Sequence, residues 1–396
     1  DEGIMKEADE IIDLGPYAGI NGGEIVANGK YEDIIKCNQS ITGMYLNSEK
    51  KIVYPKNRKK INHKIILKGA RENNLKNIDI EFPLNMMVAV TGVSGSGKST
   101  LVKKILYPAI LKNFDIYKEK SGEFKSLAGD LNLINQIEYI DQNPIGRSSR
   151  SNPVTYVKAY DDIRQLYSKQ PLAKKRNYKP KHFSFNVDGG RCDKCKGEGV
   201  IIIEMQFMAD VVLECDECDG KRFKKEILQV KFDDKSIDEI LKMTLDEAIS
   251  FFEKNGESKL INKLMPLKKV GLGYITLGQS SSNISGGEAQ RIKLASFIGK
   301  GDNKNKILFI FDEPTTGLHF HDINYLIKSL FLLIENGHSV IVVEHNLDMI
   351  KCADYIIDLG PNAGIDGGKL VASGTPEEIV KINDSHTGRF LKEKLI

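Results

Sequence analysis

The sequence predicts an α/β protein in which a mixed, mostly parallel sheet carries helices on both faces, with a smaller metal-binding module inserted into it. Two observations predict the sheet. Short apolar stretches end in glycine or polar residues, and stretches with helical periodicity separate them along the chain. The third observation, two C-x-x-C sequences inside a long stretch between sheet motifs, predicts the inserted module.

The chain has 396 residues, of which 41% are hydrophobic and 28% are charged, and its formal net charge is +3. These values are ordinary for a globular protein of two or three domains. No apolar run approaches the ~20 residues that cross a bilayer, and no signal-peptide pattern occurs. The sequence therefore predicts no contact with a membrane and a cytoplasmic location.

A peptide near the start of the chain recurs near its end. Residues 8–46 align with residues 353–391, and more than half of the aligned positions are identical. A repeat of this length predicts two copies of one structural unit, although duplication of a single hairpin is an alternative. We expect residues 1–47 to be the tail of a first domain whose remainder precedes this chain. The apolar side chains that we expect this tail to expose are Ile11, Ile12, Leu14 and Val26.

A glycine-rich turn follows the apolar stretch MMVAV and precedes a helical stretch. From Gly92 to Ser99 it fits G-x-x-x-x-G-K-[ST], in which backbone N–H groups and a helix N-terminus converge on phosphate oxygens. Lys98 can reach the β- and γ-phosphates, and the Ser99 hydroxyl can hold Mg²⁺. A glycine-rich turn without a ligand is the alternative. The predicted nucleotide contacts are Gly92, Val93, Ser94, Gly95, Ser96, Gly97, Lys98, Ser99 and Thr100.

Two carboxylates end the apolar stretch of the peptide KILFIFDEP. Asp312 suits Mg²⁺ coordination through water, and Glu313 is placed to orient or deprotonate the attacking water. Two further apolar stretches follow this pattern, and one of them ends near Gln142. The other ends at His345, whose side chain could contact the γ-phosphate. In a mostly parallel sheet the ends of such strands carry the ligand groups. An apolar strand capped by acids for solubility alone is the alternative.

The peptide NISGGEAQR predicts a second phosphate-binding helix N-terminus, because Ser285, Gly286 and Gly287 give a bare backbone where a helix begins. One ATP does not need two such cradles from one domain. The sequence therefore predicts that this cradle closes on the ATP of a partner domain.

The order of these motifs along the chain resembles that of the ATP-binding cassette family of P-loop NTPases. The motifs are, in order, the glycine-rich turn, Gln142, ISGGEAQ, FDEP and His345. The resemblance implies that Ser285–Gly287 acts as a signature used in trans. It also implies ATP and Mg²⁺ as ligands, with Ser99 and Asp312 holding the metal. The residues that match the family's nucleotide and catalytic positions are Lys98, Ser99, Gln142, Asp312, Glu313 and His345, and those we predict to be catalytic are Lys98, Gln142, Glu313 and His345.

Between Gln142 and Ser285 the chain is longer than a plain cassette needs. Two C-x-x-C pairs, separated by nineteen residues, lie in this stretch and fit a structural Cys₄ zinc site without an open coordination position. Two redox pairs are the alternative, although neither pair has a thioredoxin-like setting. The predicted zinc ligands are Cys192, Cys195, Cys215 and Cys218.

Residues 163–187 contain no acid and alternate cations with aromatic residues. Cations can contact DNA phosphates while aromatic rings stack or wedge, although a charge run is usually solvated surface. The aromatic residues are Tyr167, Tyr178, Phe183 and Phe185. The cations predicted to contact DNA are Lys174, Lys175, Arg176, Lys179 and Lys181, together with Arg147 and Arg150 from the neighbouring peptide GRSSRSN.

The motifs divide the chain into five parts. Residues 1–47 are the tail of a first cassette, and residues 48–64 form a basic linker that we interpret as solvated, with a path across DNA as the alternative. Residues 65–142 open a second cassette, residues 143–245 form the insertion, and residues 246–396 complete the cassette.

Several blocks narrow the resemblance to the UvrA family of excinuclease ABC proteins. They include GARENNLKN, DQNPIGRSSRSNPVTY, FSFNVDGGRCDKCKGEG and IIDLGPNAGIDGG, and the similarity covers nearly the whole chain. It implies an ATPase of bacterial nucleotide excision repair that dimerises, binds double-stranded DNA, senses damage and loads a helicase-like partner, the excinuclease protein UvrB. A related protein of drug self-resistance and a transporter-type ATPase subunit are the alternatives. A measured preference for damaged DNA would distinguish a repair protein from the drug-resistance protein. The lack of an apolar run long enough to cross a membrane disfavours the transporter subunit.

Overall fold

The computed structural model describes residues 2–19, 22–117, 119–146, 150–205, 208, 210–299 and 305–395. These residues divide into two compact units. The first unit comprises Asp1–Pro16, Glu24–Gln142 and Lys300–Ile396, and the second comprises Tyr17–Gly23 and Asn143–Gly299. The second unit therefore continues past residue 245, where the sequence analysis divides the chain.

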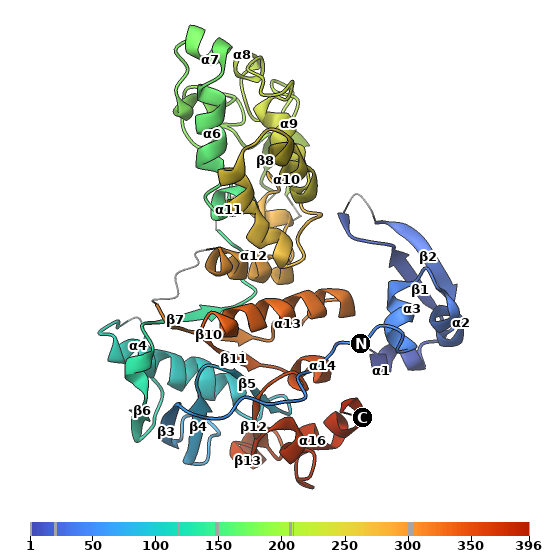
Figure 1. Cartoon of the computed structure of the whole chain (residues 1–396), viewed down its shortest axis with the longest axis vertical. Helices are drawn as coiled ribbons and strands as arrows, with labels where there is room; N and C mark the ends of the chain where they lie inside the picture. The colour runs from blue at the N-terminus through green and yellow to red at the C-terminus, as the bar shows by residue number, and fades with distance from the viewer. Residues whose placement is uncertain are drawn as a thin grey trace. The chain divides into compact units, whose positions relative to one another are not determined.

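A six-stranded sheet forms the centre of the first unit, with the strand order β13-β12-β5-β11-β10-β7 (Figure 1). All neighbouring pairs are parallel except β12 and β13, which are antiparallel. This confirms the predicted mostly parallel sheet. The strands are β5 (Met87–Gly92), β7 (Gln136–Ile140), β10 (Ile307–Asp312), β11 (Ser339–Val343), β12 (Tyr355–Gly360) and β13 (Lys369–Gly374).

The central strands are apolar on both sides, as strands covered on both faces must be. In β10, Leu308 and Ile310 join a core cluster with the antiparallel sheet and the helix after β5, whereas Phe309 and Phe311 are equally buried on the opposite face. On that face the long helix α13 (Phe320–Glu335) packs beside β11 (Figure 1).

Short strands and helices complete the first unit. A three-stranded antiparallel sheet has the order β4-β3-β6. Its strands are β3 (Lys64–Ala70), β4 (Ile78–Pro83) and β6 (Ser126–Gly129). The remaining helical elements of this part are η2 (Thr100–Leu106), α4 (Tyr107–Asn113), η3 (Leu131–Leu133), α14 (Leu347–Ile350), η6 (Gly364–Asp366), α15 (Pro376–Ile379), α16 (His386–Leu391) and η7 (Lys392–Lys394).

The repeated peptide folds in the same way twice. Strands β1 and β2 pair with a register irregularity after Asp13, as β12 and β13 do after Asp358. In each copy this aspartate accepts a hydrogen bond of 2.6 Å from a serine that caps the last helix of the repeat, Ser40 or Ser385. The elements of the first copy are β1 (Ile11–Gly15), β2 (Glu24–Gly29), α2 (Tyr31–Lys36) and α3 (Ile41–Leu46), and the short helix α1 (Glu2–Glu7) precedes them.

The two copies differ in what covers their hairpins. Ile357 and Leu359 are 0% and 1% exposed because β12 pairs with β5 inside the six-stranded sheet, whereas the matching Ile12 and Leu14 are 60% and 66% exposed. The expectation of exposed apolar side chains in residues 1–47 is therefore confirmed for Ile12 and Leu14. Ile11 and Val26 are half-buried instead.

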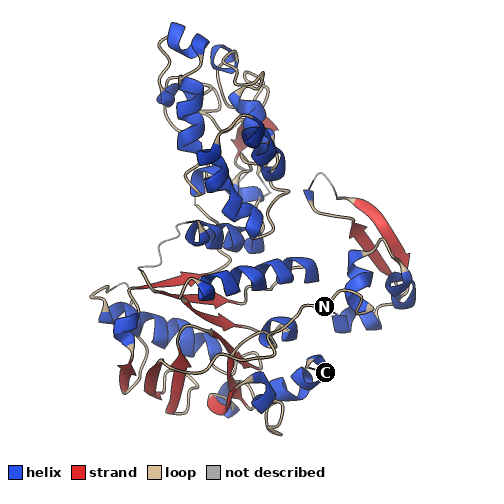
Figure 2. Cartoon of the chain, viewed as in Figure 1, coloured by secondary structure: helices blue, strands red, loops and turns tan. Residues whose placement is uncertain are grey.

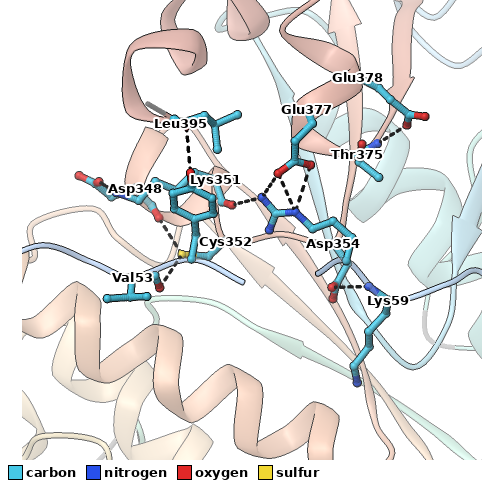
Figure 3. Close-up of polar contacts among 12 residues, drawn as sticks. Val53, Lys59, Asp348, Lys351, Cys352, Asp354, Thr375, Glu377, Glu378 and Leu395 are labelled. Carbon is cyan, nitrogen blue, oxygen red and sulfur yellow. Dashed lines mark hydrogen bonds and ion pairs between the residues drawn. The ribbon is translucent and has the colours of Figure 1, made fainter. Parts of the chain in front are cut away.

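Residues 51–60, which we call the strap, are fastened to the C-terminal part of the first unit. The Arg58 side chain is 7% exposed and donates to Glu377 Oε1 at 2.7 Å and to the Lys351 carbonyl oxygen at 2.9 Å. The Lys59 amide donates to Asp354 Oδ1 at 3.2 Å (Figure 3). Ile52 is buried, so the interpretation of a wholly solvated linker is wrong for the strap. Its four lysines, Lys51, Lys56, Lys59 and Lys60, are exposed as that interpretation expects.

We expect the substitution Arg58→Ala to release the strap. Loss of the charged hydrogen bonds to Glu377 and Lys351 should cost on the order of 2 kcal/mol, and a backbone must open locally before a protease can cut it. Trypsin should therefore cleave after Lys56 and Lys59 about thirty times faster than in the unsubstituted chain. Arg71→Ala, which breaks an exposed pair with Glu123, is the control and should leave these rates unchanged. Equal cleavage rates in Arg58→Ala and the unsubstituted chain would contradict the role of Arg58.

In its described residues the second unit consists mainly of helices and has one two-stranded hairpin (Figure 2). Ser236 and Thr244 begin two of the helices as capping boxes with Glu239 and Glu247. The helical elements are α5 (Pro153–Tyr156), α6 (Tyr160–Ser168), α7 (Pro171–Lys175), η4 (Pro180–Phe183), α8 (Lys225–Leu228), α9 (Ile237–Lys242), α10 (Leu245–Lys254), α11 (Ser258–Lys269), η5 (Ser281–Asn283) and α12 (Gly286–Ile298), and the strands are β8 (Val200–Ile203) and β9 (Val211–Glu214). Among the helices of the described residues, none has the length and apolar character that crossing a lipid bilayer requires.

Candidate functional site

The glycine-rich turn lies directly after β5 and before η2. Gly92 has a φ of 129°, and a Cβ atom there would overlap the Leu359 carbonyl oxygen of the neighbouring strand β12. Lys98 folds back over the turn and donates from Nζ to the carbonyl oxygens of Gly92 and Val93, each at 2.9 Å. Burial lowers the pKa of Lys98, which anionic phosphate oxygens would oppose. The turn therefore fits the phosphates of a nucleotide.

A second loop holds this turn in place. The Gly364 amide donates to the Gly95 carbonyl oxygen at 3.1 Å, and the Gly368 amide donates to the Ser96 carbonyl oxygen at 3.1 Å. Asn74 Nδ2 donates to the carbonyl oxygens of Gly95 at 3.0 Å and Gly364 at 3.2 Å. Sequence reasoning missed Asn74. The available signals were the repeat of the peptide around Gly364 and two blocks of the family resemblance, IIDLGPNAGIDGG and GARENNLKN, the second of which contains Asn74.

Glu313, Gln142 and His345 lie together beyond the ends of β10, β7 and β11. Gln142 Nε2 donates to the Glu313 carbonyl oxygen at 2.9 Å, and His345 Nε2 lies 3.7 Å from Glu313 Oε1. Glu313 has a φ of 45°, in the left-handed region that side-chain-bearing residues other than asparagine and aspartate seldom adopt. Burial and the charge of Lys98 lower the pKa of His345, which favours the neutral ring. The structure thus brings together three of the four predicted catalytic side chains, and Lys98 contributes its charge to the same region.

Asp312 ends β10, and Ser99 immediately precedes η2. Because β5, β11 and β10 are parallel neighbours, their carboxyl ends lie at one edge of the sheet, where both predicted Mg²⁺ ligands are found. Asp312 Oδ2 accepts a hydrogen bond of 2.6 Å from the Tyr139 hydroxyl. Burial and Asp312 raise the pKa of Tyr139, which therefore stays a donor. No sequence pattern had indicated Tyr139.

The predicted signature lies in the second unit, at the start of α12. Ser285 caps the helix in a reciprocal arrangement: its amide donates to Glu288 Oε2 at 2.8 Å, and the Glu288 amide donates to Ser285 Oγ at 3.3 Å. The Tyr274 hydroxyl donates to Glu288 Oε1 at 2.6 Å, and Arg291 behind it is buried. These contacts fix the capped turn that carries Gly286 and Gly287. The signature and the phosphate loop belong to different units.

The four cysteines of the C-x-x-C pairs form one buried cluster, in which all four sulfur atoms lie within 4.8 Å of one another. The Sγ atoms of Cys192 and Cys215 are 3.9 Å apart, and those of Cys195 and Cys218 are 3.7 Å apart. Four sulfurs placed ~2.3 Å from a tetrahedral Zn²⁺ would have such separations. The Gly199 amide donates to Cys195 Sγ at 3.3 Å, as a thiolate ligand would require. The cluster therefore fits a metal ion of this kind.

The basic segment exposes its cations but buries most of its aromatic residues. The five side chains Lys174, Lys175, Arg176, Lys179 and Lys181 are exposed. Tyr167, Phe183 and Phe185 are fully buried, and Tyr178 is half-buried. The expectation that these rings stack on or wedge between bases is therefore wrong for the three buried ones. The physical reason is that the rings pack on one another inside the second unit, Tyr160 on Phe185 and Tyr167 on Phe183, while the cations lie on its surface.

The structure describes only one of the two arginines of the peptide GRSSRSN that we predicted to contact DNA. Arg150 Nη2 lies 3.4 Å from Glu198 Oε1, and this pairing reduces the charge that Arg150 can offer to DNA. Arg147 lies outside the described residues.

The chain is similar to known proteins along its whole length. It is 54% identical over 396 residues to "UvrABC system protein A" of Clostridium perfringens, of which it spans 42%, and 49% identical to the protein of the same name from Staphylococcus aureus, of which it spans 41%. It matches the crystal structure of UvrA2 from Deinococcus radiodurans with a TM-score of 0.92 and 42% identity, covering all of this chain and 47% of that one. No family model matches the chain.

The chain thus spans about two fifths of the length of these curated relatives. The similarity includes the phosphate loop, the signature and the cysteine cluster, because it covers every residue of the chain. Sequence and fold together therefore show that the whole chain is similar to the UvrABC system protein A of these bacteria and to part of UvrA2 from Deinococcus radiodurans.

Proposed function

We propose that this chain is an ATP-hydrolysing, DNA-binding part of a damage-recognition protein in bacterial nucleotide excision repair. The observation that carries the ATPase part is the meeting of Gln142, Glu313 and His345 at the sheet edge that also carries the phosphate loop. The names of the related proteins support the repair part.

In the proposed hydrolysis, Lys98 neutralises charge on the β- and γ-phosphates, and the Glu313 carboxylate accepts the proton of the attacking water. Gln142 and His345 hold Glu313 and the γ-phosphate in place. Ser99 and Asp312 are the residues that would hold Mg²⁺, which when bound neutralises phosphate oxygens. Tyr139 fixes the orientation of the Asp312 carboxylate through its hydroxyl.

The capped turn at Ser285–Gly287 suits the γ-phosphate of an ATP held by another cassette, because a single cassette already has its own phosphate loop. The proposal therefore includes a sandwich of two cassettes that closes on ATP and reopens after hydrolysis. A homodimer of the longer protein, and the loading of the excinuclease protein UvrB onto DNA, belong to the same proposal and rest on the family resemblance.

DNA contact is proposed for the exposed cations of residues 174–181 and for Arg147 and Arg150. A sensor of chemically different lesions cannot rely on hydrogen bonds to particular base edges, so deformability and backbone shape are the properties it reads. Contacts with phosphates give an affinity that falls steeply with salt. The buried aromatic residues of the segment hold the surface that presents these cations.

The test compares two duplexes of the same sequence, one intact and one with a single bulky adduct, with ATP and Mg²⁺ at several fixed salt concentrations. We expect tighter binding to the adduct duplex. The double substitution Lys174→Ala, Lys175→Ala should weaken binding to both duplexes and lower the salt slope by about one for each lost phosphate contact.

The control for this double substitution is Lys242→Ala, Lys254→Ala, which removes the same charge from exposed lysines of the same unit outside the basic segment. It should leave both affinities nearly unchanged. Equal affinity for the two duplexes would contradict damage sensing by this chain. An unchanged salt slope in the Lys174, Lys175 variant would contradict the proposed contact surface.

A further inference from the structure

A buried carboxylate between β11 and His345 has no role in the site described so far. Glu344 is 2% exposed and lies at the end of a strand whose neighbours are β5 and β10. Its amide donates to the Val90 carbonyl oxygen at 3.1 Å, which anchors it beside the strand that leads to the phosphate loop. No motif of the sequence analysis indicates this residue.

Each oxygen of Glu344 receives two hydrogen bonds. Oε1 accepts from the Thr315 amide at 2.9 Å and from the Thr315 hydroxyl at 2.6 Å. Oε2 accepts from the amides of His345 at 2.7 Å and Asn346 at 2.9 Å. One side chain therefore joins two loops: the one that follows Glu313 and the one that carries His345.

The chemistry of the four contacts requires a carboxylate. Three partners are backbone amides that can only donate, the Thr315 hydroxyl donates as well, and an ionised carboxylate offers two oxygens that accept from all four. Burial raises the pKa of Glu344, whereas the four donors favour its ionised form. A buried charge is tolerated when it is satisfied in this way. A glutamine has nearly the same shape, but its amide nitrogen would face at least one backbone N–H that can only donate.

We propose that Glu344 is a positioning residue that keeps Glu313 and His345 in the geometry needed for ATP hydrolysis, without touching the nucleotide. Glu313 lies two residues before Thr315, and His345 directly follows Glu344, so a shift of either loop changes the 3.7 Å separation of Glu313 Oε1 and His345 Nε2. The inference rests on the proposed ATPase function.

The test measures ATP turnover and nucleotide binding of the full chain for Glu344→Gln and for the milder Thr315→Val. In Glu344→Gln we expect kcat to fall on the order of 10²-fold, because misplacing a catalytic group by about 1 Å has an effect of this size. The KM and Kd for ATP should stay unchanged, since the phosphate loop keeps its contacts. Thr315→Val should lower kcat less, because the Thr315 amide still donates, and the two substitutions should be non-additive when combined.

The matched control is Asp354→Asn, in the same unit. Asp354 is also a buried acid that accepts two backbone amides, those of Lys59 and Met87, but it lies where β5 begins rather than where it ends. This variant should lose stability and keep its kcat. A kcat in Glu344→Gln equal to that of the unsubstituted chain, or a loss matched by Asp354→Asn, would overturn the inference.

Amide hydrogen exchange without nucleotide gives a second, independent readout. In Glu344→Gln the amides of Thr315, His345 and Asn346 should exchange about tenfold faster or more, because each loses a bond to a charged acceptor. In Asp354→Asn they should be unchanged. If the exchange of either loop were unaffected by Glu344→Gln, the inference would fail even in a chain without turnover. Absence of turnover in the unsubstituted chain would instead contradict the proposed ATPase function.

Discussion

Replacing Glu313 by Gln is expected to stop ATP turnover while leaving ATP binding intact. The carboxylate is half-exposed beside His345, so the substitution removes the proposed proton acceptor without opening a cavity in the core. General base catalysis is worth about 10²–10⁴-fold, and kcat should fall by that factor. Steady-state hydrolysis and equilibrium binding of ATP, measured on the same preparation, separate the two effects.

Glu335→Gln is the control for this experiment, because Glu335 is an exposed glutamate at the end of α13 and contacts none of the predicted catalytic residues in the described contacts. Its kcat should equal that of the unsubstituted chain. Full turnover in Glu313→Gln would mean that another group takes the proton, and the proposed role of Glu313 would be abandoned.

Replacing Cys215 by Ser is expected to remove a bound metal ion and to unfold the part of the second unit around it. The hairpin β8–β9 has little core of its own: the four cysteines pack together with Ile201, while Val212 and Leu213 are exposed. Metal binding to structural Cys₄ sites contributes ~10–16 kcal/mol, which is enough to fold such a module. Elemental analysis should find one zinc for each unsubstituted chain and markedly less in the variant.

Hydrogen exchange should show where the effect lies. Amides of residues 190–222 should lose protection in Cys215→Ser, whereas those of the phosphate loop should keep theirs. Cys37→Ser, which changes a half-buried cysteine outside the cluster, should retain both metal and protection. Zinc in the same amount in Cys215→Ser, or none in the unsubstituted chain, would contradict the assignment of this site.

Much of the candidate site could be predicted because its functional residues lie close together in short segments of the sequence. The turn from Gly92 to Ser99, the acids at the end of β10 and the two C-x-x-C pairs each combine residue type and spacing within a few positions. The mostly parallel sheet followed from the same short apolar stretches, since covered strands lack polar alternation.

The residues that escaped prediction act through partners distant in the sequence. No local sequence pattern indicates such pairs. The hydrogen-bonded pairs are Glu344 with Thr315, Arg58 with Glu377, and Tyr139 with Asp312. The error over the aromatic residues had a different origin. Rings alternating with lysines are equally compatible with a DNA-stacking surface and with an amphipathic core, and only packing decides between the two.

The strap also limits how far the two copies of the repeat can move apart. From the end of α3 at Leu46 to the buried Ile52 the chain advances six residues, which span at most about 22 Å when fully extended. Even these fold back, since the amides of Asn47 and Lys50 donate to carbonyl oxygens of α3. Residues 47–51 are therefore a short, partly folded connection rather than a long flexible linker. If one copy of the repeat changed its orientation, the strap, which leads into β3, would have to rotate or come off its contacts.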